Sequence, residues 1–299
     1  MESTQTKFKK PRLLIVGSGD VGQRCIRLLR DRFHIYAVTR DPQQVQHLRA
    51  LGAHAILADL DHRPSLRRLT ALAHTVVHLA PPNADGVIDQ RTRNLIAILP
   101  DKSRLVYIST SGVYGDCAGA WVDETRSVAP KNARAVRRVD AECSLRAWAL
   151  RSHSQLSILR VPGIYAQDRL PIERLKKGTP ALIESDDVFT NHIHADDLAY
   201  LIQLALFRAK PNRVYHAVDQ TQLKMADYFD LVATYFNFPC PPRLARVELE
   251  KQISPVLLSF MSESRRLSSE RVRHELRARL TYPDVALALE KMKAAGLMF

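Results

Sequence analysis

The segment that most constrains this chain is an apolar run, Leu13 to Val16, that passes directly into a Gly-x-Gly-x-x-Gly turn formed by Gly17, Gly19 and Gly22. Residues 23–32 follow with apolar side chains at roughly helical spacing, so the stretch predicts a strand, a turn and a helix. At such a turn, free backbone N–H groups and the positive end of the helix dipole both point toward the same place, which favours binding of an anion. The pattern predicts a dinucleotide-binding turn, with a glycine loop of another α/β fold as the alternative.

Each glycine has its own expected role in that turn. Gly17 would permit the tight bend, Gly19 would let a pyrophosphate approach the backbone, and Gly22 would let the helix pack closely on the strand. The cofactor-binding residues expected at the turn are Gly17, Gly19, Asp20, Val21 and Gly22.

Strand-like apolar segments then alternate with helical segments. The expected strands are 34–39, 54–58, 75–80 and 104–111, and the expected helices are 45–51, 66–72 and 88–99. Nearly continuous apolar strands that alternate with helices are typical of a parallel sheet covered on both faces. The pattern therefore predicts an α/β fold, a Rossmann-type doubly wound parallel sheet.

The second expected strand ends at Arg40, the position at which a dinucleotide fold holds the adenosine ribose. An acidic residue there would bind the ribose hydroxyls, whereas an arginine can pair with a 2′-phosphate. Arg40 therefore favours NADP as the cofactor, with NAD as the alternative. A solvent-facing arginine at a strand end is the other interpretation of this residue.

The composition is that of a globular protein, because 46% of the 299 residues are hydrophobic and 25% are charged. No window reaches the ~18 uncharged apolar residues of a membrane helix, and the N-terminus lacks the apolar stretch of a signal peptide. We therefore expect a cytoplasmic protein without a membrane partner. The four cysteines show no C-x-x-C spacing, so we expect reduced structural thiols.

A formal net charge of +13 would suit nucleic acid or an anionic cofactor. The sequence shows no zinc-finger, RNP-type or basic-zipper pattern, so nucleic acid is the less favoured partner. A small-molecule substrate is the partner that we expect, and a homodimer is left open.

Several motifs, in order along the chain, resemble one known superfamily. They are the glycine turn, Asp59-Leu60, Leu79-Ala80, and residues 106–116 (VYISTSGVYGD), 159–165 (LRVPGIY), 191–199 (NHIHADDLA) and 214–219 (VYHAVD). Over residues 12–219 the chain is similar to the extended short-chain dehydrogenase/reductase superfamily, of the NAD-dependent epimerase/dehydratase type. The resemblance implies this fold and a nicotinamide cofactor, but no particular reaction.

The resemblance also implies roles for individual residues. The implied cofactor contacts beyond the glycine turn are Arg40 at the adenosine end, Asp59 and Leu60 at the adenine, and the backbone of Ala80 at a ribose. Thr110 and Ser111 stand where the family carries the hydroxyl that helps to polarise a substrate carbonyl. Tyr165 stands where the chain crosses into a substrate lobe, so it is expected at the substrate.

The chain departs from the family at the catalytic helix, where members carry Tyr-x-x-x-Lys. With the chain aligned on Glu142, Arg134 takes the tyrosine position and Arg138 the lysine position. An arginine stays protonated and is no general acid or base, although Arg138 could still donate to the cofactor ribose. The alternative interpretation is that Arg134 and Arg138 are both solvent-facing arginines on the helix surface, without a role at the site. The departure resembles the atypical branch of the superfamily. In this chain, Tyr114 or Tyr165 could supply the proton instead; the alternative is that both are packing aromatics.

The rest of the chain is expected to form a smaller, mainly helical substrate lobe. The predicted division is 11–164 with 188–218 for the Rossmann domain, and 165–187 with 219–299 for the lobe. Residues 188–194 are expected to return to the main sheet, Asp196 or Asp197 to cap a helix over 198–207, and further helices to cover 170–177, 225–238 and 248–260. Arg265 and Arg266 would face an anionic substrate or begin a solvated helix, and no metal site is expected.

Two classes of function fit this pattern. The first is an atypical NADP-dependent oxidoreductase for a small polar or anionic substrate, in which the cofactor supplies the hydride. Its candidate catalytic residues are Thr110, Ser111, Tyr114, Arg134 and Arg138. The second class is a dinucleotide-binding sensor without turnover, which the missing tyrosine favours. A nucleotide-sugar epimerase is a weaker third interpretation, because an epimerase would depend most on that tyrosine.

Overall fold

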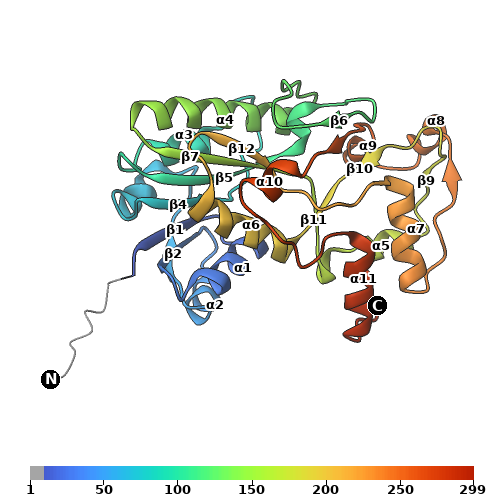
Figure 1. Ribbon diagram of the computed structural model, residues 1–299, viewed down its shortest axis with the longest axis horizontal. Helices are drawn as coiled ribbons and strands as arrows, with labels where there is room; N and C mark the ends of the chain where they lie inside the picture. The colour runs from blue at the N-terminus through green and yellow to red at the C-terminus, as the bar shows by residue number, and fades with distance from the viewer. Residues whose placement is uncertain (1–9) are drawn as a thin grey trace.

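The computed structural model describes residues 10–299, apart from the side chains of residues 255, 256 and 260. Its centre is a parallel sheet of seven strands (Figure 1). The strands are β1 (Arg12–Val16), β2 (His34–Thr39), β3 (His54–Leu57), β4 (Thr75–His78), β5 (Arg104–Thr110), β7 (Gln155–Val161) and β12 (Arg213–His216). They lie in the order β12, β7, β5, β4, β1, β2, β3, so the winding reverses between β1 and β4. Open α/β sheets bind ligands beside the carboxyl ends of the strands at such a reversal.

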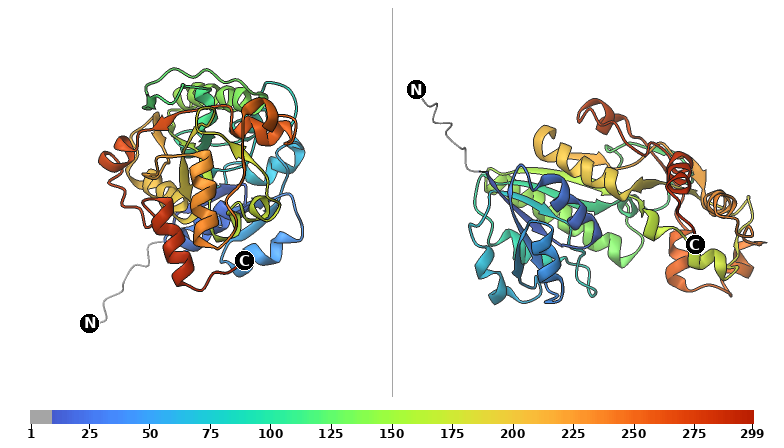
Figure 2. Two further views of the ribbon diagram at one scale, coloured as in Figure 1. Left: turned by 90° about the vertical axis from the view of Figure 1, so that its right-hand side faces the viewer. Right: turned by 90° about the horizontal axis from the view of Figure 1, so that it is seen from below.

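Helices cover both faces of the sheet (Figures 1 and 2). One face carries α1 (Asp20–Leu29), α2 (Gln44–Ala50) and α6 (Ala195–Arg208); the other carries α3 (Gln90–Ile96), α4 (Ala133–Arg151) and the 3-10 helix η1 (Arg63–Leu69). Successive side chains of β1 point to opposite faces of the sheet. Ile15 packs in one core with α1 and α6, and Leu14 packs in a second core with α4. The predicted Rossmann-type doubly wound α/β fold is confirmed.

A smaller lobe lies beyond the carboxyl ends of the strands (Figure 1). Its helices are α5 (Ile172–Lys176), α7 (Met225–Tyr235), α8 (Arg246–Leu249), α9 (Pro255–Phe260) and α11 (Val285–Ala294). Its short strands are β9 (Ala181–Leu182), β10 (Phe189–Thr190), β13 (Leu223–Lys224) and β14 (Arg243–Leu244). A core of its own joins α5, α7 and α11 through Leu175, Val232 and Leu289.

Further short elements connect the lobe to the sheet. They are η2 (Ser111–Tyr114), β6 (Trp121–Val122), β8 (Gly163–Tyr165), η3 (Gln167–Arg169), β11 (His192–His194), β15 (Arg266–Leu267) and α10 (Glu270–His274). The expectation that residues 188–194 return to the main sheet is wrong. β10 pairs with β13 and β11 pairs with β8, because the place beside β7 is occupied by β12.

Two expected helices also differ in detail. The cap of α6 is His194, whose Nδ1 accepts the N–H of Asp196 at 3.2 Å, so neither aspartate caps the helix. Asp197 instead accepts the N–H groups of Thr281 and Tyr282 at 2.9 and 2.8 Å, which fastens the chain before α11. The helix expected over 248–260 is broken into α8 and α9, since Pro255 suits only the first turn of a helix.

Residues 63–69 form a 3-10 helix where a helix over 66–72 is expected. Within residues 10–299, no helix is both long and apolar enough to cross a bilayer. Cys25 and Cys117 are buried, Cys143 and Cys240 are exposed, and all four are free thiols. Burial raises the pKa of Cys25 to about 12, which keeps this thiol protonated and unreactive.

Candidate functional site

The glycine turn between β1 and α1 has the close contacts of a phosphate-binding turn. Gly17 has a φ of +101°, and a Cβ there would lie 2.6 Å from the backbone nitrogen of Ala80. A Cβ on Gly22 would lie 2.5 Å from the carbonyl oxygen of Gly17. Gly17 therefore lets the loop after β4 reach the turn, and Gly22 lets α1 pack against it.

Gly19 differs from these two glycines because it faces open space. It is exposed, and no atom lies within 4 Å of a Cβ placed on it. It is also the N-cap of α1 without any side-chain hydrogen bond to the helix, which leaves the first N–H groups of α1 to a ligand. Room above Gly19 and an uncapped helix end fit a phosphate group of a dinucleotide.

Charged side chains surround Asp20, the first residue of α1. Arg24 donates to Asp20 at 2.8 Å and also forms an ion pair with Asp196 on α6. Arg169 of η3 lies 3.4 Å from Asp20, so the segment that leads into the lobe reaches the phosphate-binding end of α1. The sequence analysis missed Arg169, because no local spacing signals a contact between such distant segments.

The loops after β2 and β3 form the adenosine end. Arg40 lies exposed directly after β2. A hydrogen bond from Arg91 and the charge of Arg40 lower the pKa of Asp61, which places Arg40 close to the loop after β3. In that loop Asp59 accepts the N–H of Asp61 at 2.9 Å, and the carbonyl of the buried Leu60 accepts the Asn94 side chain at 2.8 Å.

Arg91 on α3 joins two of the loops and was also missed. It forms two hydrogen bonds with Asp61, at 2.8 and 2.6 Å. It also donates to the carbonyls of Pro81 and Pro82 at 3.1 and 3.2 Å. Arg91 thereby fixes the loop after β4, which carries Ala80, to the loop after β3.

Arg138 reaches the carboxyl ends of β4 and β5 from α4. Its Nη1 donates to the Ile108 carbonyl at 2.8 Å and to the Tyr107 hydroxyl at 3.0 Å, and lies 3.5 Å from the Ala80 carbonyl. The structure therefore brings together Arg138 and Ala80, two of the residues implied at the cofactor. Arg134, one turn earlier, is exposed in the first turn of α4.

Thr110 and Ser111 lie at the same edge of the sheet, where β5 ends. The Thr110 hydroxyl oxygen accepts the N–H of Gly112 at 3.2 Å, which leaves the hydroxyl proton for another acceptor. Thr110 is half-buried and Ser111 is buried. Ile108, whose carbonyl accepts from Arg138, belongs to the same strand β5, so these residues share the carboxyl end of that strand.

Tyr114 lies behind this turn in a buried polar network. Its hydroxyl lies 2.6 Å from Nε2 of His216 and accepts from Arg160 at 2.8 Å. Arg160 forms a buried ion pair with Glu142 at 2.7 Å, and Glu142 accepts the Ser109 hydroxyl at 2.6 Å. Burial raises the pKa of Tyr114 to about 12. This buried environment favours a packing role for Tyr114 over a role as proton donor to a substrate.

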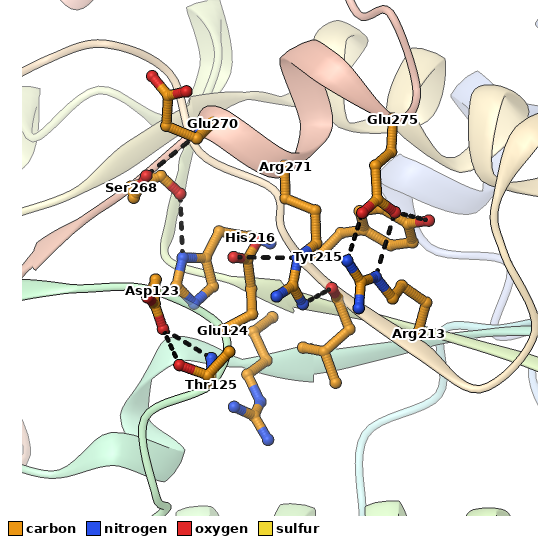
Figure 3. A network of polar contacts seen from close by, with 12 residues as sticks. Asp123, Glu124, Thr125, Arg213, Tyr215, His216, Ser268, Glu270, Arg271 and Glu275 are labelled. Atoms are coloured by element: carbon orange, nitrogen blue, oxygen red, sulfur yellow. Dashed lines mark hydrogen bonds and ion pairs between the residues drawn. The ribbon is translucent and has the colours of Figure 1, made fainter.

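His216 joins that network to Glu124 and to the Ser268 backbone (Figure 3). Its Nδ1 lies 3.1 Å from the Ser268 carbonyl, and its backbone N–H donates to Glu124 at 3.0 Å. Glu124 is paired with Arg271 of α10 at 3.5 Å. Burial lowers the pKa of His216 to about 3, so the imidazole is neutral. The network joins α4, β5, β7 and β12 to the segment that follows β15.

A family model described as NAD(P)H-binding matches residues 17–207 of this chain. The chain belongs to the NAD(P)H-binding family. No curated protein matches the sequence. A solved protein of this fold, described as a functionally unknown conserved protein from Silicibacter pomeroyi DSS, shares 30% sequence identity with a TM-score of 0.80, covering 96% of this chain and 99% of that one.

Two solved epimerases are similar in fold alone. UDP-N-acetylglucosamine 4-epimerase from Bacillus cereus is 15% identical, with a TM-score of 0.71 over 96% of this chain and 99% of that one. UDP-glucose 4-epimerase from Thermotoga maritima is 16% identical, with a TM-score of 0.73 over 95% and 99%. The family and the turn geometry agree on a nicotinamide dinucleotide as the cofactor of this NAD(P)H-binding protein.

Tyr165 of this NAD(P)H-binding protein is buried at the junction of sheet and lobe. It is 1% exposed, and its ring lies 5.3 Å from that of His194 in an edge-on contact. Burial, and then the charge of the nearby Asp219, raise its pKa. The Tyr165 side chain is therefore enclosed in this structure, and its role at a substrate stays a prediction.

Within residues 10–299, no group of three or more His, Cys, Asp or Glu side chains is arranged to hold a metal ion. His194 is engaged as the cap of α6, and its pKa is lowered to about 4, chiefly by burial.

Proposed function

We propose that this protein is an atypical NADP-dependent oxidoreductase that acts on a small polar or anionic substrate. The observation that carries the proposal is Arg138, whose guanidinium lies at the carboxyl ends of β4 and β5, 3.5 Å from the Ala80 carbonyl. A cofactor bound at the glycine turn extends across this edge of the sheet toward β5. Arg138 is then the fixed positive donor for the nicotinamide ribose, the part that the lysine takes in the related families.

Arg40 supports NADP as the preferred cofactor. It is an exposed guanidinium directly after β2, close to the loop after β3 that would hold the adenine. The planar fork of an arginine suits a 2′-phosphate. Asp61, the neighbouring acid, is neutralised by two hydrogen bonds from Arg91 and so competes less for Arg40.

The substrate would meet Thr110 and Ser111 on one side and Arg134 on the other. The Thr110 hydroxyl has its proton free to donate to a substrate carbonyl, because its oxygen already accepts the N–H of Gly112. Arg134 is exposed in the first turn of α4 and would anchor a carboxylate or phosphate. The bound cofactor supplies the hydride, while these residues orient the substrate and stabilise charge on its oxygen.

A dinucleotide-binding sensor without turnover is the second candidate. It is favoured by the burial of both candidate tyrosines, because Tyr114 and Tyr165 are each 1% exposed. Neither hydroxyl is therefore open to a substrate. None of the nine tyrosines in the sequence is followed four residues later by a lysine.

A nucleotide-sugar epimerase is the third candidate. The two epimerases of similar fold act on UDP-sugars by their descriptions. We rank this function lower, because Arg134 stands at the tyrosine position of the helix, and a guanidinium stays protonated and so cannot exchange a proton with the sugar.

Ligand-dependent thermal melts separate the candidates. A ligand that binds only the native state raises the melting temperature with its concentration. We expect NADPH to give the largest shift among NAD, NADH, NADP, NADPH and a set of UDP-sugars. Turnover is then followed as loss of NADPH absorbance with small aldehydes, ketones and keto acids. NADPH binding without turnover on any of them supports the sensor, and a shift with UDP-sugars but none with NADPH contradicts the oxidoreductase.

A further inference from the structure

A polar pocket lies between β15, the start of α10 and the segment after β12. Its volume is about 270 Å³, and its lining includes Trp121, Asn191, Gln222, Arg266 and Ser268. Figure 3 shows Ser268 and Glu270, two of the lining residues, above His216. Arg266, expected from the sequence either to face an anionic substrate or to begin a solvated helix, lines this pocket, whereas the residues implied at the dinucleotide do not.

Arg266 is held in place in this pocket by two aromatic rings and one hydrogen bond. Its guanidinium carbon lies 5.2 Å from the ring centre of Trp121 and 4.8 Å from that of Phe189. Its Nε donates to the Gly119 carbonyl at 2.8 Å. Aromatic contacts of this kind occupy the faces of a guanidinium, so its other N–H groups can form hydrogen bonds only at the edge of the plane.

The surrounding backbone holds this arrangement in place. Gly119 has a φ of +73°, and a Cβ there would lie 3.2 Å from the ring of Phe189. The N–H of Phe189 donates to the Ser264 hydroxyl at 3.0 Å, and the N–H of Gly119 donates to the Ser264 carbonyl at 3.1 Å. The guanidinium of Arg266 is therefore positioned before any ligand arrives.

The neighbouring Arg265 takes part in a different environment. Its Nη1 donates to the Gly115 carbonyl at 2.7 Å and pairs with Glu263 at 2.8 Å. Arg265 directly precedes β15 and Arg266 begins it, and the two guanidinium groups donate to different carbonyls, those of Gly115 and Gly119. The pocket at Arg266 is thus separate from the turn that carries Ser111 and Tyr114.

Among the charged side chains that line the pocket, Arg266 forms no ion pair with a carboxylate of the described residues, whereas Arg273 is paired with Glu270. Arg266 and Arg273 bring two positive charges, and Glu270 brings one negative charge that already faces Arg273 at 3.8 Å and His274 at 3.0 Å. The second acid, Asp219, is 2% exposed, and its Oδ1 is engaged by the N–H of Thr221 at 2.9 Å. We propose that this pocket binds the oxyanion of a small carboxylate or phosphate compound through the edge of the Arg266 guanidinium.

The test uses the fluorescence of Trp121. The sequence has two tryptophans, of which Trp121 is 51% exposed and Trp148 is 5% exposed in the core, so an anion in this pocket changes mainly the Trp121 signal. The full chain is titrated with inorganic phosphate and with succinate at constant ionic strength, and with glycerol as a neutral probe. We expect a saturable change with at least one anion and none with glycerol, and the tighter anion identifies the class of ligand.

Four variants assign the site. Arg266→Gln should lower the affinity for the anion at least tenfold. The adjacent Arg265→Gln and the cofactor-turn variant Gly19→Val should leave the anion titration unchanged. Arg266→Lys keeps the contact with the rings but loses the planar fork, so it should also weaken the anion and carries the test if Arg266→Gln does not fold. A response that never saturates, or an affinity that is the same with Lys or Gln at position 266, overturns the proposal.

Discussion

Arg160 and Glu142 face each other in the core, where the guanidinium of β7 donates to the carboxylate of α4 at 2.7 and 3.1 Å. Their side chains are 6% and 5% exposed. Glu142 is one helical turn after Arg138, and Arg138 is one turn after Arg134, so all three lie along one side of α4. The buried pair therefore fixes the rotation of α4 that directs Arg138 at the ends of β4 and β5.

We expect Glu142→Ala to destabilise the protein severely. Removal of one partner leaves a buried guanidinium uncompensated, which typically costs about 3–5 kcal/mol. Urea unfolding measures the loss. The control is Glu173→Ala, whose exposed pair with Lys176 should contribute less than ~1 kcal/mol. Equal losses in the two variants would contradict the role given to the buried pair.

Gly19 and Gly22 of the turn should respond differently to substitution. Gly19→Val should abolish NADPH binding yet leave the melting temperature nearly unchanged, because its side chain enters open space where the pyrophosphate would lie. Gly22→Ala should lower stability by about 1–3 kcal/mol, since its Cβ meets the Gly17 carbonyl oxygen. Calorimetric titration and thermal unfolding check both. Unchanged NADPH affinity in Gly19→Val would place the cofactor elsewhere.

NADPH should bind more tightly than NADH, and Arg40→Ala should narrow the difference. The lost contact with the 2′-phosphate is worth about 1.5–3 kcal/mol, or roughly tenfold or more in affinity. NADH binding in the same variant is the internal control, because NADH has no 2′-phosphate. Equal affinities for the two cofactors in the parent protein would remove the basis for Arg40 as the selector.

Arg138→Ala should weaken NADPH binding about tenfold, because a charged donor at the ribose is lost. Arg134→Ala should leave NADPH affinity unchanged and impair only substrate turnover or anion binding. The double variant Arg134→Tyr/Arg138→Lys restores the family pattern and should gain activity on a carbonyl substrate. If both alanine variants bind NADPH as the parent does and the double variant gains nothing, the alignment on Glu142 is wrong.

Stability should fall as the pH is lowered from about 6.5 toward 4. Burial lowers the pKa of His78, His192 and His216 to about 3 each, so these imidazoles are neutral in the folded chain. The unfolded chain takes up their protons below its ordinary histidine pKa of about 6.5, which favours unfolding by up to about 1.4 kcal/mol per pH unit for each. Urea unfolding at pH 7.5 and pH 5.5 measures the effect. His194, whose pKa is lowered to about 4 chiefly by burial, contributes in the same direction, so His78→Gln should reduce this pH dependence by about one quarter. An unreduced dependence would argue that His78 is not neutral in the folded state.

Local patterns were enough to predict the nucleotide-binding half of the molecule. The alternation of apolar strands with helices predicts the doubly wound sheet, and the spacing of Gly17, Gly19 and Gly22 predicts the turn, because both patterns arise within one strand-turn-helix unit. The expected role of Arg138 came from the family resemblance, through the alignment on Glu142, and stays a prediction. Its contact with the Ile108 carbonyl needed the sheet.

The sequence by itself determined the order and type of the main elements, because each depends on side chains a few residues apart. Only the tertiary structure decided that β12 takes the place beside β7, that Arg91 joins the loops of Asp61 and Pro81, and that Tyr114 is buried against Arg160. It also decided that Arg265 and Arg266, adjacent in sequence, enter separate environments. These outcomes depend on partners from distant segments, which meet only after the sheet and the lobe have packed together.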